Sequence, residues 1–336
     1  MTESLKIVIP MAGFGSRMRP HTWSKPKQLI QIADKTLLGH VLDMLNTLPP
    51  TMPRELVFIT GYLGSQMKPF MDEHYPSVTV YFVEQQEMLG QSHAIWQARD
   101  LLGGPMIMVY SDTLVTTDLS FLADEPAGGV AWVREVPDPR RFGVAEVDAH
   151  GRVTRLIEKP DSMDNKLAVV GFYYFADSLA LLDAIQEQLV QDISFKGEYF
   201  LVDAINILIR RGMFMRIEPV EVWLDAGKPD ATLETNAWLL ENGRANLKGG
   251  SESDGVTIIP PVYIPASAKI EESVIGPHVS LGEGVRVKGS VIQNSIIEAA
   301  AEIIGSQIHD SLIGRRAKVR GVQGKLNIGD DSEIEL

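Results

Sequence analysis

A glycine-rich segment near the N-terminus carries positive charges where a phosphate group could bind. Residues 13–29 read Gly-Phe-Gly-Ser-Arg-Met-Arg-Pro-His-Thr-Trp-Ser-Lys-Pro-Lys-Gln-Leu and follow the apolar run 5–10, which is typical of a buried strand. Glycines at the carboxyl end of a strand let backbone N–H groups approach phosphate oxygens closely. Because Arg17 and Lys27 add two cations to this turn, the segment predicts a pocket for a triphosphate.

The spacing of the glycines excludes two other phosphate-binding loops. A dinucleotide fingerprint requires a third glycine at the position of Met18. A Walker loop requires Gly-Lys-Ser/Thr, whereas Gly15 is followed by Ser16 and Arg17. For Gly13 and Gly15 taken alone, a simple tight turn is the alternative interpretation.

The segment resembles the signature of sugar-1-phosphate nucleotidyltransferases, Gly-x-Gly-Ser/Thr-Arg-Leu/Met-x-Pro-x-Thr followed by Pro-Lys-x-Leu. Further motifs similar to that family follow in order at 140–144, 158–160, 223–229 and 328–332, the last reading Ile-Gly-Asp-Asp-Ser. The likeness covers nearly the whole chain and is greatest to the long-form glucose-1-phosphate thymidylyltransferases. It implies that a sugar-1-phosphate oxygen attacks the α-phosphorus of a nucleoside triphosphate and releases pyrophosphate.

The resemblance assigns catalytic roles to two cations and two carboxylates. Arg17 is expected to hold the β and γ phosphates and Lys27 the α-phosphate, while Asp112 and Asp225 are expected to hold Mg²⁺. Either aspartate could instead cap a turn or lie in a surface loop. Of the three basic residues Arg17, Lys25 and Lys27, Lys25 is the one most readily interpreted as a solvated surface cation.

The same resemblance implies a nucleotide site and a sugar-phosphate site. The nucleotide site is expected to comprise Ala12, Gly13, Gly15, Ser16, Gln85 and Gly90. The side-chain amide of Gln85 offers a donor and an acceptor, which suit the imide edge of a pyrimidine. The sugar-phosphate site is expected to comprise Gly143, Glu158, Lys159 and Val169. Lys159 would receive the phosphate and Glu158 the sugar hydroxyls, although Glu-Lys-Pro can also form a plain exposed turn.

Two structural patterns must position these residues. Up to about residue 240, short β runs such as 56–60 and 106–110 alternate with probable helices such as 37–48 and 92–102. This order predicts an α/β fold with a doubly wound, mostly parallel, Rossmann-like sheet and ligands at its carboxyl edge. Asp112 follows one of these predicted strands directly.

After residue 255, a branched apolar residue recurs every five or six positions. The repeated residues are Ile258, Ile264, Ile270, Ile275, Leu281, Val287, Ile292, Ile297, Ile303, Ile308, Ile313 and Val319. A period near six predicts a left-handed hexapeptide-repeat β-helix of about four coils. The sequence therefore predicts a catalytic domain over 1–245, a polar, glycine-rich linker over 246–255, and a β-helix over 256–336.

Composition limits the partners of the chain. Its 336 residues are 45% hydrophobic and 22% charged, with a formal charge of −13, which argues against nucleic acid or an anionic membrane as a partner. There is no cysteine, so disulfides and Cys-ligated metals are excluded. No apolar run approaches 18 residues, and a cytoplasmic enzyme is expected.

Several alternatives stay open at this level. The nucleotide could be dTTP, which the whole-chain likeness favours, or UTP, and the sugar is expected to be glucose. The chain could also be a non-catalytic regulatory subunit, or a bifunctional enzyme whose β-helix transfers acyl groups with His278 or His309. We expect the β-helix to support a homo-oligomer, and a chain ending near residue 245 to retain nucleotidyl transfer.

Overall fold

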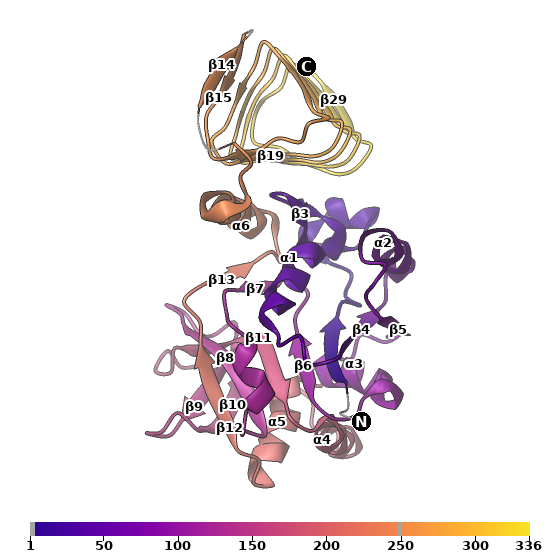
Figure 1. The fold of residues 1–336 in the computed structure, drawn as a ribbon, viewed down its shortest axis with the longest axis vertical. Coiled ribbons are helices and arrows are strands. Elements are labelled where there is room, and N and C mark those ends of the chain that lie inside the picture. The colour runs from indigo at the N-terminus through magenta and orange to yellow at the C-terminus, as the bar shows by residue number, and fades with distance from the viewer. Residues whose placement is uncertain (1–3, 248–249, 254) are drawn as a thin grey trace. The chain divides into compact units, whose positions relative to one another are not determined.

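The computed structural model describes residues 4–247, 250–253 and 255–336, which form two compact units. Unit 1 comprises Met1–Gly13 and Leu42–Trp223, and unit 2 comprises Phe14–Val41 and Leu224–Leu336. The glycine-rich segment is thus divided: its first glycine belongs to unit 1, while the part with Arg17 and Lys27 belongs to unit 2. Figure 1 follows the chain by colour from residue 1 to residue 336.

Unit 1 is built on a nine-stranded sheet that is parallel in one half and mainly antiparallel in the other. The parallel half has the order β6-β1-β4-β5, and β11 then joins β6 antiparallel and pairs with β8 and β9. The strands of this sheet are β1 (Leu5–Pro10), β4 (Arg54–Thr60), β5 (Val80–Glu84), β6 (Met106–Val109), β8 (Gly129–Glu135), β9 (Gly143–Val147), β10 (Val153–Glu158), β11 (Leu167–Phe175) and β12 (Met215–Pro219). The short strand β7 (Thr113–Val115) follows β6.

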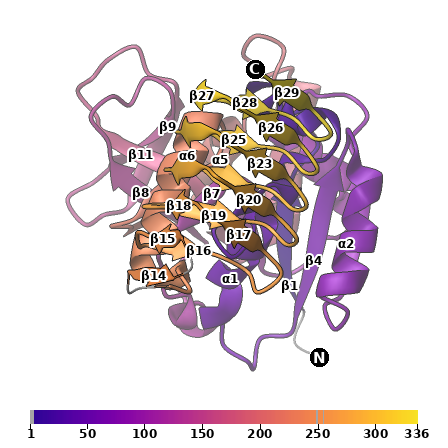
Figure 2. The same ribbon diagram turned by 90° about the horizontal axis from the view of Figure 1, so that it is seen from above.

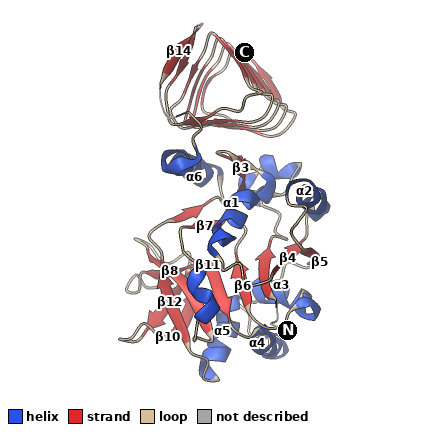
Figure 3. Cartoon of the chain, viewed as in Figure 1, coloured by secondary structure: helices blue, strands red, loops and turns tan. Residues whose placement is uncertain are grey.

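The helices of unit 1 are drawn in blue in Figure 3, and those at residues 91–97, 178–190 and 201–210 share a continuous apolar core with the sheet. The helices of this unit are α2 (Met67–His74), α3 (Gln91–Gln97), α4 (Ser178–Val190) and α5 (Leu201–Arg210), with short 3₁₀ turns η4 (Met44–Thr47), η5 (Gly64–Gln66), η6 (Arg99–Leu101) and η7 (Ser120–Asp124). The start of α4 is fixed by Asp177, whose carboxylate accepts hydrogen bonds from the first-turn amides of Leu179 and Ala180. The expected α/β class is confirmed, with a sheet of mixed direction.

Unit 2 contains a β-helix with three faces, and the strands within each face are stacked parallel to one another (Figure 2). One face comprises β15 (Val256–Ile258), β18 (Val274–Ile275), β21 (Val291–Gln293), β24 (Gln307–His309) and β27 (Gln323–Gly324), preceded by the antiparallel strand β14 (Ser251–Ser253). The second comprises β16 (Val262–Tyr263), β19 (Val279–Leu281), β22 (Ile296–Ile297), β25 (Leu312–Ile313) and β28 (Asn327–Ile328). The third comprises β17 (Lys269–Glu271), β20 (Arg286–Lys288), β23 (Glu302–Ile304), β26 (Lys318–Arg320) and β29 (Glu333–Glu335).

The predicted repeat residues all belong to the core of this β-helix. They are buried there except Ile264 and Ile270, which are partly buried. The strands continue for one more coil after Val319, so the expected number of about four coils is too low. The apolar repeat is interrupted in this last coil because Gly324 stands at an inward position and offers no side chain. Residues 248–249 and 254 of the predicted linker lie outside the described residues.

Unit 2 also contains the cation-bearing segment and the elements that lead into the β-helix. These are η1 (Ser16–Met18), η2 (His21–Trp23), η3 (Lys27–Leu29), β2 (Gln31–Ile32), β3 (Lys35–Thr36), α6 (Pro229–Leu239) and the turn η8 (Leu240–Arg244); α1 (Leu37–Asp43) and β13 (Trp223–Asp225) each span a unit boundary. No helix in the described ranges is long and apolar enough to cross a membrane.

Candidate active site

The carboxyl end of β1 presents the backbone that was predicted to contact the nucleotide. Ala12 is buried and Gly13 is exposed, and the Met11 N–H donates to the Ile59 carbonyl at 2.8 Å. A methyl group at Gly61 would lie 2.6 Å from the Ala12 carbonyl oxygen, so a glycine is required beside this strand end. Sequence reasoning missed Gly61, since nothing in its local sequence indicates this close approach.

Gln85 supports the turn that contains Gly90. The Gln85 side chain is buried, its Nε2 donates to the Gly90 carbonyl at 3.3 Å, and it lies 3.2 Å from His93 Nδ1. Gly90 has a φ of +99°, and a methyl group there would lie 2.6 Å from the Tyr199 carbonyl oxygen. Both predicted residues therefore meet in one turn, and contact of either with a base stays a prediction.

The turn after β6 holds Asp112 at the edge of the sheet. The Thr113 hydroxyl donates to the Val170 carbonyl at 3.1 Å, and the Tyr110 N–H donates to the Gly171 carbonyl at 2.9 Å. Gly171 has a φ of +78°, and a methyl group there would lie 2.0 Å from the Tyr110 ring. These contacts with β11 fix the backbone on both sides of Asp112, whose side chain is partly buried.

Tyr110 connects the environment of Asp112 with that of Glu158. Burial raises the pKa of the Tyr110 hydroxyl, and the negative charges of Glu158 and Asp112 raise it further. The phenol is therefore neutral over the physiological range and can donate a hydrogen bond. Tyr110 was not predicted from the sequence, where it reads as an ordinary residue at the end of a strand.

Three of the predicted sugar-phosphate residues lie together on adjacent strands. Gly143 in β9 is paired with Glu158 at the end of β10. A methyl group at Gly143 would lie 2.8 Å from Val169 Cγ2 and 3.3 Å from Glu158 Oε2. Gly143 does not have a positive φ, so its backbone conformation does not require glycine. The absence of a side chain instead leaves space next to the carboxylate of Glu158.

Lys159 completes this group from the turn after β10. Its Nζ lies 3.6 Å from Glu158 Oε1 and 4.6 Å from the centre of the Phe200 ring. Burial raises the pKa of Glu158. The positive charge of Lys159 acts to lower this pKa, whereas the negative charges of Asp203 and Glu198 raise it further. Lys159 has a φ of +45°, an unusual conformation for a side-chain-bearing residue. The ammonium group thus stands exposed beside a partly buried carboxylate.

In unit 2, the turn η1 exposes Arg17 and buries its neighbour Met18. Gly15, just before this turn, has a φ of +59°, and the Thr22 hydroxyl donates to its carbonyl at 2.9 Å. A methyl group at Gly15 would lie 2.9 Å from Thr22 Cγ2, so only glycine fits. Within the described ranges the Arg17 side chain makes no hydrogen bond or ion pair, which leaves the guanidinium available to an anion.

Lys25 is not a surface cation, and this expectation from the sequence is wrong. Its side chain is completely buried, forms an ion pair with Glu298 and lies 3.0 Å from Asp330 Oδ1. Both partners come from the β-helix, far along the chain, so no local signal could have predicted the pairing. Lys27, two positions later, is partly buried in η3.

Asp225, the second predicted metal ligand, lies at the end of β13 with an exposed side chain. Its Oδ1 accepts a hydrogen bond from the Gly227 N–H at 2.7 Å, and its carbonyl accepts one from the Thr235 hydroxyl at 2.9 Å. No group of three or more His, Cys, Asp or Glu side chains suited to a metal occurs among the described residues. The assignment of Asp112 and Asp225 as metal ligands stays a prediction.

A family model described as nucleotidyl transferase matches residues 6–242. The chain belongs to this family. The nucleotidyltransferase class expected from the glycine-rich segment is therefore confirmed. Members of the family generally use a divalent metal.

Two relatives match along almost the whole chain. The low-salt glycan biosynthesis nucleotidyltransferase Agl11 of Haloferax volcanii is 32% identical, over 99% of this chain and 100% of the relative. A glucose-1-phosphate thymidylyltransferase of Streptomyces antibioticus is 30% identical, over 99% of each chain. The crystal structure of a UDP-glucose pyrophosphorylase complexed with UDP-glucose shares the fold, with a TM-score of 0.61 and 20% identity over 71% of this chain and 100% of that one.

Proposed function

We propose that this nucleotidyltransferase transfers the nucleotidyl group of dTTP to glucose-1-phosphate, giving the nucleotide sugar and pyrophosphate. The observation that carries the proposal is the group of Gly143, Glu158, Val169 and Lys159. A partly buried carboxylate next to a glycine suits sugar hydroxyls, and a lysine beside it suits the attached phosphate. The full-length similarity to a glucose-1-phosphate thymidylyltransferase supports the same substrates.

Two cations, the exposed Arg17 and the partly buried Lys27, would act on the nucleoside triphosphate. Arg17 would neutralise the β and γ phosphates, and Lys27 the α-phosphate, as charge develops on the leaving pyrophosphate. The exposed Gly13 backbone and the turn of Gln85 and Gly90 would contact the nucleotide. Such a reaction requires positioning and charge neutralisation and no covalent intermediate on the protein.

The chemistry of the two carboxylates fits Mg²⁺, which commonly binds one or two carboxylates plus phosphate oxygens and waters. Asp112 and Asp225 would hold it, with the remaining ligands from the triphosphate. When bound, the ion would lower the cost of negative charge on the phosphates. The hydrogen bond from Gly227 N–H to Asp225 leaves its other carboxylate oxygen for this purpose.

A grid of substrates tests the proposal. Pyrophosphate release would be measured with dTTP, UTP, dCTP and ATP against glucose-1-phosphate and galactose-1-phosphate, with Mg²⁺ present. We expect the highest kcat/KM for dTTP with glucose-1-phosphate, by about tenfold over UTP, because a single methyl group is worth about 1–3 kcal/mol of discrimination. Preference for UTP would make the enzyme a uridylyltransferase, and no release with any pair would refute the proposal.

The β-helix would serve assembly and support and would catalyse no second reaction. His278 lies 2.8 Å from Glu241, and His309 lies 3.1 Å from its own neighbour Asp310 on an exposed part of the β-helix. Neither arrangement resembles a built acyl-transfer site. Light scattering that gives the mass of a monomer would refute the homo-oligomer, and acetyl transfer from acetyl-CoA at enzymatic rates would refute the single activity.

A further inference from the structure

The segment that contains Arg17 and Lys27 is held by buried charges of the β-helix. We call residues 14–30 the signature loop. Lys25 of this loop is completely buried between Glu298 and Asp330, and the second oxygen of Glu298 accepts the Gln31 N–H at 3.1 Å. A buried ammonium group is tolerated only when its charge is paired and its hydrogen bonds are satisfied.

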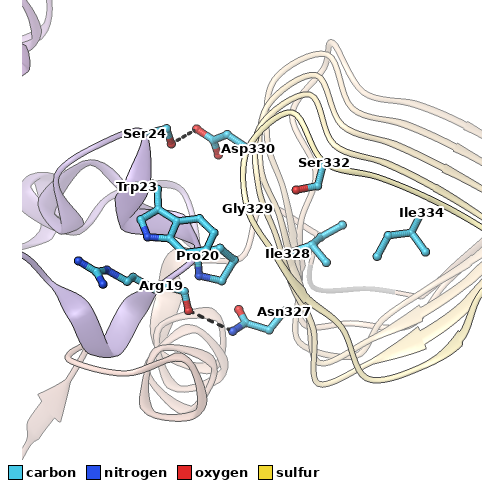
Figure 4. A pocket seen from close by; sticks show the side chains of 10 residues that line it. All are labelled: Arg19, Pro20, Trp23, Ser24, Asn327, Ile328, Gly329, Asp330, Ser332 and Ile334. Carbon is cyan, nitrogen blue, oxygen red and sulfur yellow. Dashed lines mark hydrogen bonds between the residues drawn. The ribbon is translucent and has the colours of Figure 1, made fainter.

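Asp330 is itself bound from several sides. Its carboxylate accepts a hydrogen bond from the Ser24 hydroxyl at 2.8 Å (Figure 4). It also accepts hydrogen bonds from the Arg315 N–H at 2.8 Å and from Arg315 Nε at 2.9 Å. Asp330 thus connects two residues of the signature loop, Ser24 and Lys25, to the last coil of the β-helix. Because the charged groups of Lys25, Glu298 and Asp330 are buried and paired with one another, loss of one member leaves a buried charge without compensation.

An apolar contact holds the other end of the loop. Met18, which follows Arg17 directly, is buried in a cluster with Ile30, Leu233, Ile296 and Leu312. Ile296 and Leu312 belong to β22 and β25 on one face of the β-helix. The 3₁₀ turn that exposes Arg17 is therefore seated on that face through its buried neighbour.

Close backbone contact completes the attachment near Pro20. A methyl group at Gly329 would lie 3.2 Å from Pro20 Cβ and from the Pro20 carbonyl oxygen, so a side chain there would push Pro20 away by a few tenths of an ångström (Figure 4). Asn327 Oδ1 lies 2.7 Å from His21 Nε2. The His21 side chain is buried, and burial lowers its pKa, so the ring stays neutral in this contact.

We propose that the β-helix positions the phosphate-binding cations, with Lys25, Glu298 and Asp330 as the positioning residues. Arg17 is adjacent to the anchor Met18, and Lys27 lies two residues after the anchor Lys25. Both anchors are buried, and each fixes the backbone next to one of the two phosphate-binding cations. The inference rests on the proposed function of Arg17 and Lys27, and it replaces the expectation that a chain ending near residue 245 would retain nucleotidyl transfer, since Glu298 and Asp330 would be missing.

The test uses the full-length protein with Asp330→Asn and Glu298→Gln, each of which removes a charge and nearly keeps shape. We expect kcat to fall about tenfold or more, because a misplacement of about 1 Å can cost about a hundredfold in rate. KM for the nucleoside triphosphate should rise, while KM for the sugar-1-phosphate stays within about twofold. Hydrogen–deuterium exchange in peptides covering 14–30 should increase, and exchange in the strands of unit 1 should not.

Asp331→Asn is the matched control. Asp331 is the next residue, is exposed, and pairs with Arg316. The Asp331→Asn substitution should leave hydrogen–deuterium exchange at 14–30, kcat and both KM values unchanged. Lys25→Arg, which keeps the charge, should retain more activity than Lys25→Met, a distinction that loss of packing alone would not give.

Two results would overturn the proposal. One is wild-type kcat and unchanged exchange at 14–30 in both Asp330→Asn and Glu298→Gln. The other is a rise in exchange throughout both units with equal effects on both KM values, which would indicate a general structural role. If a charge variant does not fold, Gly329→Ala displaces the neighbouring contact between the last coil and Pro20 more gently, and normal kinetics together with increased exchange at 14–30 in this variant would count against the proposal. A wild-type protein inactive on every substrate pair would refute the proposed function alone, because the exchange experiment would still report how the loop is held.

Discussion

Lys25 Nζ and Asp330 Oδ1 lie 3.0 Å apart, with both side chains almost completely shielded from solvent, although 305 positions separate the residues in sequence. The motif Ile-Gly-Asp-Asp-Ser at 328–332 therefore has a physical partner in the glycine-rich segment. Its glycine admits Pro20, its first aspartate binds Lys25 and Ser24, and its second aspartate faces Arg316.

This contact should make the stability of the protein sensitive to acid. Burial by itself raises the pKa of Asp330. The charge of Lys25 and the hydrogen bonds that the Asp330 carboxylate accepts outweigh burial and lower this pKa from 3.8 to about 2. A carboxyl with a depressed folded pKa stabilises the fold above its unfolded value and loses this effect as pH falls through the folded value. The contribution of Asp330 is about 2 kcal/mol at neutral pH.

We therefore expect the wild-type protein to lose more unfolding free energy than Asp330→Asn as the pH falls from about 4 to about 2. Urea denaturation at several pH values would measure both curves. Asp331→Asn should follow the wild-type curve closely, since the exposed pair with Arg316 is screened by solvent. Parallel curves for wild type and Asp330→Asn would show that the buried pair is not formed in solution.

The metal proposal predicts a severe loss of kcat in Asp112→Asn and in Asp225→Asn, by about a hundredfold or more, because each carboxylate would help to neutralise charge on the transferring phosphate. Folding should be little affected, since Asp225 is exposed and Asp112 only partly buried. Steady-state kinetics over a range of Mg²⁺ concentrations would measure the effect. Asp118→Asn, an exposed carboxylate near β7, is the control, and full activity in excess chelator would contradict the assignment.

The two substrate anions should be separable by mutation. Arg17→Ala should raise KM for the nucleoside triphosphate or lower kcat, with little change in KM for the sugar-1-phosphate, whereas Lys159→Ala should mainly raise KM for the sugar-1-phosphate. The physical reason is that each cation would contact a different substrate. Lys196→Ala is a matched control, because Lys196 also lies over a phenylalanine ring, that of Phe195 at 5.1 Å. Small, equal effects of both variants on both substrates would identify the two residues as surface cations.

The sequence allowed the elements to be predicted where a local period determines burial. The six-residue period marked the β-helix core, and alternating β and helical runs marked the parallel half of the sheet. Ile264 and Ile270 are less buried than the other repeat residues because they lie next to β16 and in β17, the first-coil strands that are paired on one side only. Ile258 of the same coil is buried, since its strand β15 is also paired with β14.

Residues whose role depends on distant partners could not be predicted in this way. Lys25 lies in a polar segment that reads as exposed, and its burial depends on Glu298 and Asp330. Gly61 and Gly171 look like ordinary glycines until the backbone of Ala12 and the ring of Tyr110 are placed against them. Long-range packing decides each of these cases, and a single sequence contains no period or spacing that reports it.

Gly143→Ala tests the sugar-phosphate group without removing any charge. The added methyl would lie 2.8 Å from Val169 Cγ2, 3.3 Å from Glu158 Oε2 and 3.4 Å from Val202 Cγ2, so Glu158 would have to move away from its present position. We expect KM for the sugar-1-phosphate to rise about tenfold while KM for the nucleoside triphosphate stays within about twofold. Steady-state titration of each substrate against a fixed excess of the other would measure both values.

The steric explanation can be checked by relieving the contact. In Gly143→Ala combined with Val169→Ala, the new methyl group has space where Val169 Cγ2 was, and we expect KM for the sugar-1-phosphate to return toward the wild-type value. Gly103→Ala is the control for adding a methyl group to unit 1, because nothing lies within 4 Å of the position that it would occupy. If the double variant is as impaired as the single one, Gly143 does not act through space beside Glu158, and the sugar hydroxyls must be sought elsewhere on the sheet.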